Sequence, residues 1–227
     1  MNSRNLIRWT GVAAMAAGII FAGIQPIHPP DVLASVTTDA WAIIQSFKLA
    51  MSVLFLVGIA GLYARQVEAA GWLGLAGFLL FSLTWVIQMP FIFVQALINP
   101  LLATALPAFV ESFLAIVNGH PGEMNIGVLP VLYNLAGLLY ALGGLLFGIA
   151  TFRAGILPRR AAGLLAIGAV APIVLAMLPH PLDRSLAVPM GLAMAWLGYA
   201  LLSERRAQAP EPVPGRSSPQ LRPTTAE

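Results

Sequence analysis

The sequence contains no cysteine, and this absence excludes disulfide bonds, thiolate nucleophiles and metal sites with cysteine ligands. Charged residues are also scarce: they make up 9 % of the chain, against about 25 % in a typical soluble domain. The chain has no phosphate-binding loop, no glycine-rich dinucleotide turn after a strand and no Gly-x-Ser-x-Gly motif. It therefore lacks the sequence signatures of common nucleotide-binding enzymes and serine hydrolases.

Long apolar runs dominate what is present. Hydrophobic residues make up 59 % of the sequence, the mean hydropathy is +0.84, and the apolar residues fall into blocks of about 20 residues, the length a helix needs to cross a bilayer. The sequence thus predicts an all-α polytopic membrane protein with six transmembrane helices. The predicted spans are Leu6–Ile24, Trp41–Tyr63, Trp72–Leu97, Ile126–Phe152, Ala161–Leu178 and Leu186–Ser203.

The charges between these spans predict the orientation of the chain. Arginines lie before the first span, in the second and fourth connections and after the last span, whereas the first and third connections contain acids and no base. Arg184 is the single arginine on the opposite side. The positive-inside rule therefore predicts that both termini are cytoplasmic. The pI of 9.8 is explained by this topology and by contact with anionic lipid, and not by nucleic-acid binding.

Two segments outside the spans have a composition of their own. The third connection, residues 98–125, carries apolar residues at helical spacing, with polar and small residues opposite them. We expect an amphipathic helix on the outer membrane interface there, because a seventh span would place the arginines of the next connection outside. Residues 207–227 are rich in proline and predict a disordered cytoplasmic tail, which leaves residues 1–206 as the transmembrane domain.

Each of the three histidines opens the same tetrapeptide, His-Pro-any residue-acid, and all three tetrapeptides lie on the predicted outer side. Imidazoles and carboxylates gathered there would suit zinc or another divalent transition metal. The alternative is structural, since proline ends one helix and the acid caps the next or balances its dipole. A third interpretation is a set of protonatable pairs that sense pH. The candidate metal ligands are His28, Asp31, His120, Glu123, His180 and Asp183.

A second set of polar residues lies deeper in the predicted spans. Gln45 and Lys48 share one face of the second span, and Gln88 and Gln95 lie on the third. An ionisable residue inside a membrane is a functional candidate, although Lys48 can also snorkel outwards and single amides can simply pair helices. These residues predict a polar cavity that opens to the outer side. Its candidate ligand-binding residues are Lys48, Gln88, Asn134 and Gln45.

Part of the sequence recurs at an interval of 152 residues. The residues of the first copy are Arg8, Gly11, Ala14, His28, Pro29 and Asp31, and those of the second are Arg160, Gly163, Ala166, His180, Pro181 and Asp183. The third span opens with Gly71-Trp72-Leu73-Gly74, a looser version of Arg8-Trp9-Thr10-Gly11. The odd-numbered spans are therefore predicted to be diverged copies that each start inside and end outside, as parallel repeats of membrane proteins do.

Four short motifs carry a family resemblance: Leu62–Gln66, Gly74–Phe78, Gly155–Arg160 and Ala195–Ala200. Through them, residues 4–203 resemble a group of bacterial six-span membrane proteins of unknown function. The resemblance implies a location in the bacterial inner membrane and brings with it no activity, cofactor or site.

The sequence favours a membrane protein that binds or transports a small ligand or a cation from the outer side. One alternative is a metal-dependent membrane hydrolase, in which water bound among the three histidines is activated by the metal. Another is a structural or accessory subunit of a membrane complex. The expected contacts are the lipid bilayer and a small molecule or ion, and no nucleic acid.

Overall fold

The computed structural model describes residues 3–175 and 186–203, and the regular structure within them is entirely helical, so the all-α prediction is confirmed for this part of the chain. The α-helices are α1 (Ser3–Ile24), α2 (Asp39–Phe93), α3 (Asn99–Leu102), α4 (Pro107–Val117), α5 (Leu129–Ala154), α6 (Arg159–Leu175) and α8 (Val188–Ser203). Two short 3₁₀ turns, η1 (Gln25–Ile27) and η2 (Leu33–Ser35), follow α1, and a π-helical turn, η3 (Val94–Ile98), extends α2.

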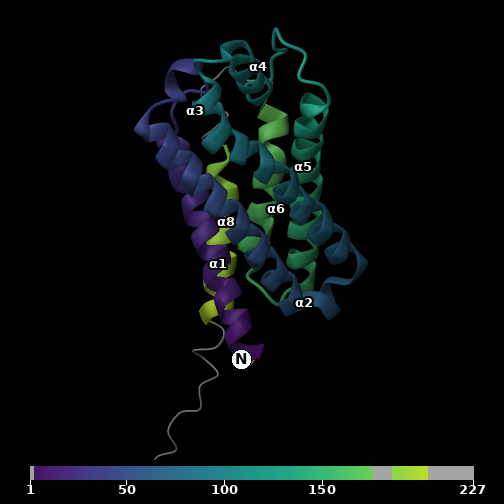
Figure 1. Ribbon diagram of the computed structural model, residues 1–227. Helices are drawn as coiled ribbons and strands as arrows, with labels where there is room; N and C mark the ends of the chain where they lie inside the picture. Colours follow the sequence, from purple (N-terminus) through teal and green to yellow (C-terminus); the bar gives the residue numbers. More distant parts are fainter. Residues whose placement is uncertain (1–2, 176–185, 204–227) are drawn as a thin grey trace, which may run out of the picture.

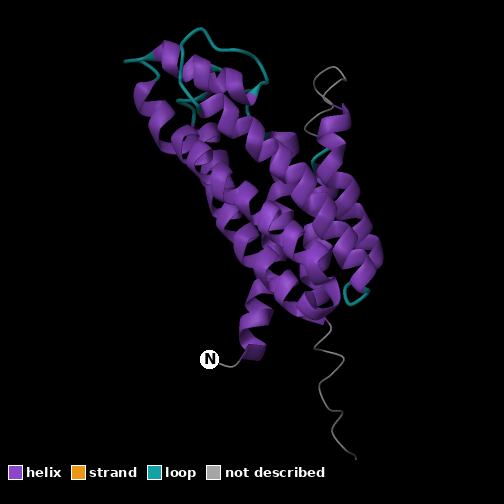
Figure 2. Cartoon of the chain, turned by 90° about the vertical axis from the view of Figure 1, so that its right-hand side faces the viewer, coloured by secondary structure: helices purple, strands orange, loops and turns teal. Residues whose placement is uncertain are grey.

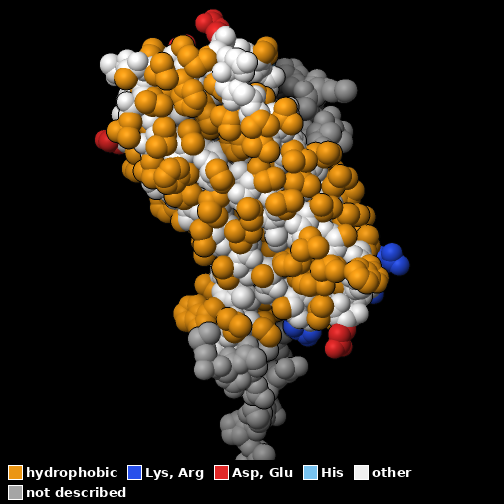
Figure 3. Space-filling view, turned by 45° about the vertical axis from the view of Figure 1, so that its right-hand side comes forward, with side chains coloured by type: hydrophobic (Ala, Val, Ile, Leu, Met, Phe, Trp, Pro, Cys, Tyr) orange, Lys and Arg blue, Asp and Glu red, His pale blue; other side chains and the backbone are white. Residues whose placement is uncertain are grey.

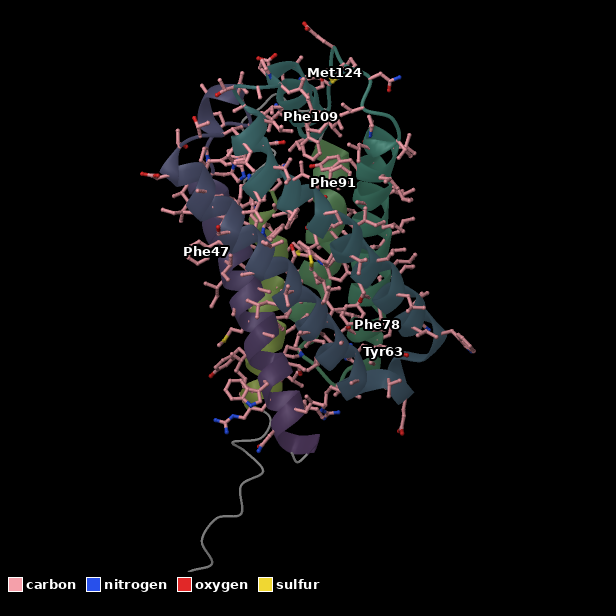
Figure 4. All side chains as sticks on the ribbon, viewed as in Figure 1. Phe47, Tyr63, Phe78, Phe91, Phe109 and Met124 are labelled. Atoms are coloured by element: carbon pink, nitrogen blue, oxygen red, sulfur yellow. The ribbon has the colours of Figure 1, made fainter. Side chains whose placement is uncertain are left out.

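Helix α2 is a hairpin of two arms that turns at Gly71. Gly71 has φ 55° and ψ −156°, a conformation that is open to glycine and costly for other residues. On either side of it, Tyr63 stacks on Phe78 with ring centroids 4.6 Å apart, and Phe55 stacks on Trp85 at 4.0 Å. The partners in each pair lie at similar distances along the chain before and after Gly71. The first arm (residues 39–70) and the second arm (residues 72–98) are therefore antiparallel. Figure 4 shows the Tyr63–Phe78 pair near the turn.

The hairpin confirms that the second and third predicted spans are separate helical segments and corrects the connection between them. The sequence predicted a loop over Ala64–Gly71, but the first arm stays helical as far as Ala70. The helix continues because residues 64–70 contain no glycine or proline, so the chain reverses only at the first glycine.

Close contacts at glycines define the neighbours of each helix. A methyl group added at Gly18 would lie 2.3 Å from the carbonyl oxygen of Gly191, so α1 and α8 approach backbone to backbone. Similar contacts pair Gly58 with Ala14 (first arm and α1), Gly77 with Phe147 (second arm and α5), Gly148 with Ala166 (α5 and α6) and Gly168 with Met190 (α6 and α8). The six segments α1, first arm, second arm, α5, α6 and α8 therefore form a bundle closed into a ring in chain order (Figure 1, Figure 2).

The ring has a packed interior rather than a channel along its full length. Large side chains from several helices fill it, among them Phe55, Phe81, Phe147, Met190 and Met194, each at most 1 % exposed. Its geometry also agrees with the sequence repeat. Ala14 and Ala166, which correspond in the two copies, each pack against a glycine of a neighbouring helix, Gly198 and Gly148 respectively.

The outer surface of the bundle is apolar and suits contact with lipid. Three stretches combine the length and the composition needed to cross a membrane: Asn5–Ile27, Asp39–Leu102, which contains both arms, and Leu129–Ala154. Helix α8 is apolar but shorter. Exposed hydrophobic side chains cover the molecule between its two ends (Figure 3), including Ile167 and Val131 at 66 % and 65 % exposure. These features make the chain a candidate membrane protein.

Apart from Lys48, the described charged residues gather at the two ends of the bundle. One end, which we call the basic end, has the α2 turn and the α5–α6 connection, with a single acid, Glu68. The other, the acidic end, has the segments between α1 and α2 and between α2 and α5. The arginines of the basic end are Arg8, Arg65, Arg153, Arg159 and Arg160, and the acids of the acidic end are Asp31, Asp39, Glu111 and Glu123. Figure 3 shows this separation.

Helix α4 occupies the third connection, where the sequence predicted an amphipathic helix. Val110 and Leu114 pack with Val36 and Trp41 in a second small core, and Phe113 lies 5.7 Å from Phe91 between ring centroids. The opposite face, with Ala108, Glu111 and Asn118, is exposed, as the pattern predicted. The apolar spacing predicted a face with Leu102, Leu106, Phe109, Phe113 and Ile116; Phe113 and Ile116 are buried, whereas Leu106 precedes the helix and is 43 % exposed. The helix therefore covers the acidic end of the bundle (Figure 1, Figure 4).

Candidate functional site

The first tetrapeptide motif brings His28 to the start of the first arm. The η1 turn ends at Ile27, and His28 is extended, with φ −66° and ψ 125°, because the residue before a proline is driven out of the helical region. Its imidazole ring then lies edge-on to the indole of Trp41, with ring centroids 6.1 Å apart. The proline that ends the helix thus also positions the histidine.

Lys48 lies between this histidine and the second arm. Its Nζ is 3.3 Å from His28 Nε2 and 3.3 Å from Gln95 Oε1. His28 Nδ1 is 2.6 Å from the carbonyl oxygen of Pro29, which can only accept a hydrogen bond, so Nδ1 carries the proton. Nε2 is then free of a proton and accepts from the Lys48 ammonium. Lys48 is the only lysine of the chain.

Gln95 is presented by the π-helical turn at the end of the second arm. In this turn the amide of Asn99 donates to Val94 O, five residues back. The corresponding donor for Gln95 O would be residue 100, which is a proline and has no N–H. The indole Nε1 of Trp41 donates to Gln95 O instead, at 2.8 Å. Trp41 thereby satisfies the backbone group that Pro100 leaves open, and it fixes the two arms at this level.

Two buried carboxamides lie within one helical turn of these contacts along the chain and have no hydrogen-bond partner among the described residues. Trp41, Gln45 and Lys48 are spaced to share one helix face, so Gln45 faces the second arm between two side chains that both contact Gln95. Asn99 lies one turn beyond Gln95. Both amides are 0 % exposed, and within the described part of the chain neither atom of either amide has a hydrogen bond. We refer to these residues with their hydrogen-bonded neighbours as the polar cluster: His28, Trp41, Gln45, Lys48, Gln95 and Asn99.

The four predicted ligand-binding residues are thus only partly brought together. Lys48 and Gln45 are in the polar cluster. Gln88 is half-buried on the second arm, two helical turns before Gln95, and makes none of the cluster's hydrogen bonds. Asn134 is exposed on α5 and also takes no part in them. Gln95, named with Gln88 on the third span but left out of the candidates, belongs to the cluster, and Asn99 was missed. The one local signal for both was Asn99-Pro100 after an apolar run, which indicates a helix irregularity.

The second tetrapeptide has a structural role in the chain. Gly119, with φ 75°, ends α4, and the amide of His120 donates to Ala115 O at 2.9 Å, the hydrogen-bond pattern of a Schellman motif. The side chains of His120 and Glu123 are exposed. Asp31, in contrast, is 5 % exposed, and its backbone oxygen accepts from Asn118 Nδ2 at 2.9 Å, which ties the first motif to the end of α4.

The predicted metal site requires all three tetrapeptides. Among residues 3–175 and 186–203, no three histidine, aspartate or glutamate side chains lie close enough together to share a metal ion. His180 and Asp183 lie outside the described residues. The six-ligand site therefore stays a prediction, to which the described part of the chain contributes two separate pairs, His28 with Asp31 and His120 with Glu123.

No family model, no curated protein and no solved structure matches this chain.

Proposed function

We propose that the chain is a bacterial inner-membrane protein that crosses the bilayer six times and binds a small ligand in the polar cluster from the outer side. The closed ring of six helical segments supports six crossings, because each segment packs beside the next segment along the chain. The arginines of the basic end support a cytoplasmic location for that end and for both termini. The acidic end, with α4 across it, then faces outwards, and the resemblance to bacterial six-span proteins supports the inner membrane.

The observation that carries the binding function is the polar cluster itself. A purely structural bundle would gain little from a lysine between two helices, because an ammonium at membrane depth is costly. Here Lys48 is held by His28 and Gln95 beside two fully buried amides. A buried amide without partners costs about 1–3 kcal/mol for each group left unsatisfied. A ligand that completes these hydrogen bonds recovers that free energy as affinity.

The irregular backbone around the cluster supports the same function. The extended His28 segment and the π-helical turn both interrupt regular helix at this level. In membrane proteins, non-helical backbone is found where it is buried in protein or lines a polar site, and π-helical turns are frequent at functional sites.

Thermal unfolding in lipid nanodiscs tests this function. The melting temperature of the purified protein is measured with a panel of small solutes: acetate and L-lactate as anions, choline as a cation, and acetamide and erythritol as uncharged molecules. At least one solute should raise the melting temperature by mass action. Lys48→Met should abolish the rise, and Gln66→Leu, which changes a buried glutamine of the same arm far from the cluster, should keep it. A panel without any effect, or a rise that persists in Lys48→Met, overturns the proposal.

A further inference from the structure

We infer that the ligand is an uncharged molecule with a hydrogen-bond donor and an acceptor side by side, such as a carboxamide or a pair of vicinal hydroxyls. This inference rests on the proposed function and names the class of ligand that the same site takes. It follows from the hydrogen-bonding groups that the site leaves open and from the charges that surround them.

The open groups are two donors and two acceptors. Gln45 contributes Nε2 and Oε1, and Asn99 contributes both atoms of its amide, all with negligible exposure and no hydrogen bond within the described residues. An anion accepts from the two NH₂ groups and leaves both carbonyl oxygens unsatisfied. A cation satisfies the oxygens and leaves the NH₂ groups. Only a ligand that both donates and accepts hydrogen bonds satisfies both amides. Each amide group that stays unpaired keeps the free-energy cost of being buried away from water, and the affinity is lower by that amount.

The charges at the site favour the same class. Lys48 places a positive charge beside Gln95, one helical turn along the chain from each open amide's nearest cluster contact, and this charge repels a cation. Asp31, three residues after His28, is a buried acid of the opposite formal charge in the same tetrapeptide. The two formal charges balance. In a layer removed from water a further unpaired charge is costly, whereas an uncharged polar molecule adds none.

The wall of the site fits a small ligand with an apolar side. The indole of Trp41 is fully buried, packs against the His28 ring and is anchored through Nε1 to Gln95 O. Because Nε1 already donates to Gln95 O, the indole has no other polar atom that could hydrogen-bond to the ligand. A methyl or methylene group opposite the polar group of the ligand would contact this ring.

An isosteric series tests the inference. Acetamide, acetate and acetamidinium have nearly the same shape and differ in charge and in the balance of donors and acceptors. Each is titrated against the protein in nanodiscs, with ligand-detected NMR and the shift in melting temperature as two readouts. Acetamide should bind, and acetate and acetamidinium should bind at least tenfold more weakly. Ethylene glycol is titrated in parallel. The ratio of its affinity to that of acetamide shows whether the site binds a pair of vicinal hydroxyls or a carboxamide more tightly.

Two matched variants assign the binding to the amides. Gln45→Leu should weaken acetamide binding at least tenfold, and Gln66→Leu should leave it unchanged. If acetate or acetamidinium binds better than acetamide and the binding depends on Gln45, the site is a ligand site and the inference about its class is wrong. If none of the four probes binds, the inference about the ligand class fails, and the proposed function fails with it only if the wider solute panel also leaves the melting temperature unchanged.

Discussion

Gln45 and Gln66 lie on the same arm of α2, and both are buried, yet their surroundings differ. Gln66, near the basic end, is 1 % exposed and donates through Nε2 to the Thr151 hydroxyl of α5 at 2.8 Å. Gln45, near the acidic end, is 0 % exposed and has no hydrogen bond on either side-chain atom. Gln66 joins two helices through a hydrogen bond. Gln45 makes no hydrogen bond, although its neighbour Lys48 contacts His28 and Gln95.

The backbone differs between the two ends in the same way. Around Gln66 the first arm is a regular helix up to the turn at Gly71, and small residues such as Gly74 and Ala150 pack beside the stacked Tyr63 and Phe78 rings. Around Gln45 the second arm contains Pro90, turns into a π-helix and is followed by Pro100, while α1 gives way to an extended segment. Regular helices with small residues provide the stability of the bundle, and the irregular end provides the polar cluster. The comparison therefore separates the end with regular helices from the end at which we propose ligand binding.

The largest expected effect concerns the sides of the membrane on which the two ends lie. Because the chain has no native cysteine, single cysteines can be introduced at exposed alanines of each end. In intact cells an impermeant thiol reagent should label Ala105→Cys at the acidic end and leave Ala69→Cys at the basic end unlabelled. Both should react after the cells are opened. Labelling of Ala69→Cys in intact cells would reverse the assignment of the two ends.

A second comparison uses the tryptophans of the two ends. Trp41 is fully buried and holds the two arms together, whereas Trp72, beside the α2 turn, is 85 % exposed. Trp41→Ala should lower the free energy of unfolding by about 3–5 kcal/mol, and Trp72→Ala by less than about 0.5 kcal/mol. Reversible unfolding in mixed micelles measures both. Similar losses for the two variants would mean that Trp41 is not a packing anchor.

The two glutamines give a third, smaller difference. Gln66→Leu leaves the buried Thr151 hydroxyl without its donor, and the free energy of unfolding should fall by about 1–3 kcal/mol. Gln45→Leu removes an amide that has no partner, so the same quantity should stay constant or rise by up to about 1 kcal/mol. The measurement is made without added solute. A larger loss for Gln45→Leu than for Gln66→Leu would show that Gln45 has a structural partner and would remove it from the binding site.

The smallest expected effect is at the π-helical turn. Pro100→Ala supplies the N–H that the Gln95 carbonyl lacks, so the new amide competes with the Trp41 indole. Stability should change by less than about 1 kcal/mol, within the range of ordinary substitutions. The indole N–H resonance of Trp41, assigned by comparison with Trp41→Phe, should shift upfield as its hydrogen bond weakens. An unchanged resonance would mean that proline at this position does not determine the Trp41 contact.

The sequence predicted the helices well and their faces poorly, for a physical reason. The blocks of apolar residues in the first four spans correspond to α1, the two arms of α2 and α5, and the acids and arginines of the connections are separated at the two ends as predicted. Asn134 was assigned to the interior but is exposed on α5, because a span that is apolar all round has no pattern to tell lipid from bundle interior.

The polar cluster was half predicted for a similar reason. Spacing on one helix placed Gln45 beside Lys48, since the α-helical period holds within the first arm. It named Gln95 with Gln88 on the third span but did not place Gln95 beside Lys48, and it gave no indication of Asn99. The π-helical turn shifts the period by one residue there. The contact between His28 and Lys48 joins residues 20 positions apart through an extended segment, and no periodicity links such positions.

The contact between Gly18 and Gly191 has a consequence for the order of events during synthesis. Helix α1 leaves the ribosome before the other segments of the ring, and α8, which packs against it, leaves after them. At roughly 5–20 residues per second, the glycine face of α1 waits on the order of 10–35 s for its partner. During that interval this face contacts lipid or the insertion machinery, and the other helices can already assemble pairwise behind it. Closure of the ring is therefore the last step in the assembly of the ring. In a nascent chain halted before residue 191, the glycine face of α1 would have no part of α8 packed against Gly18.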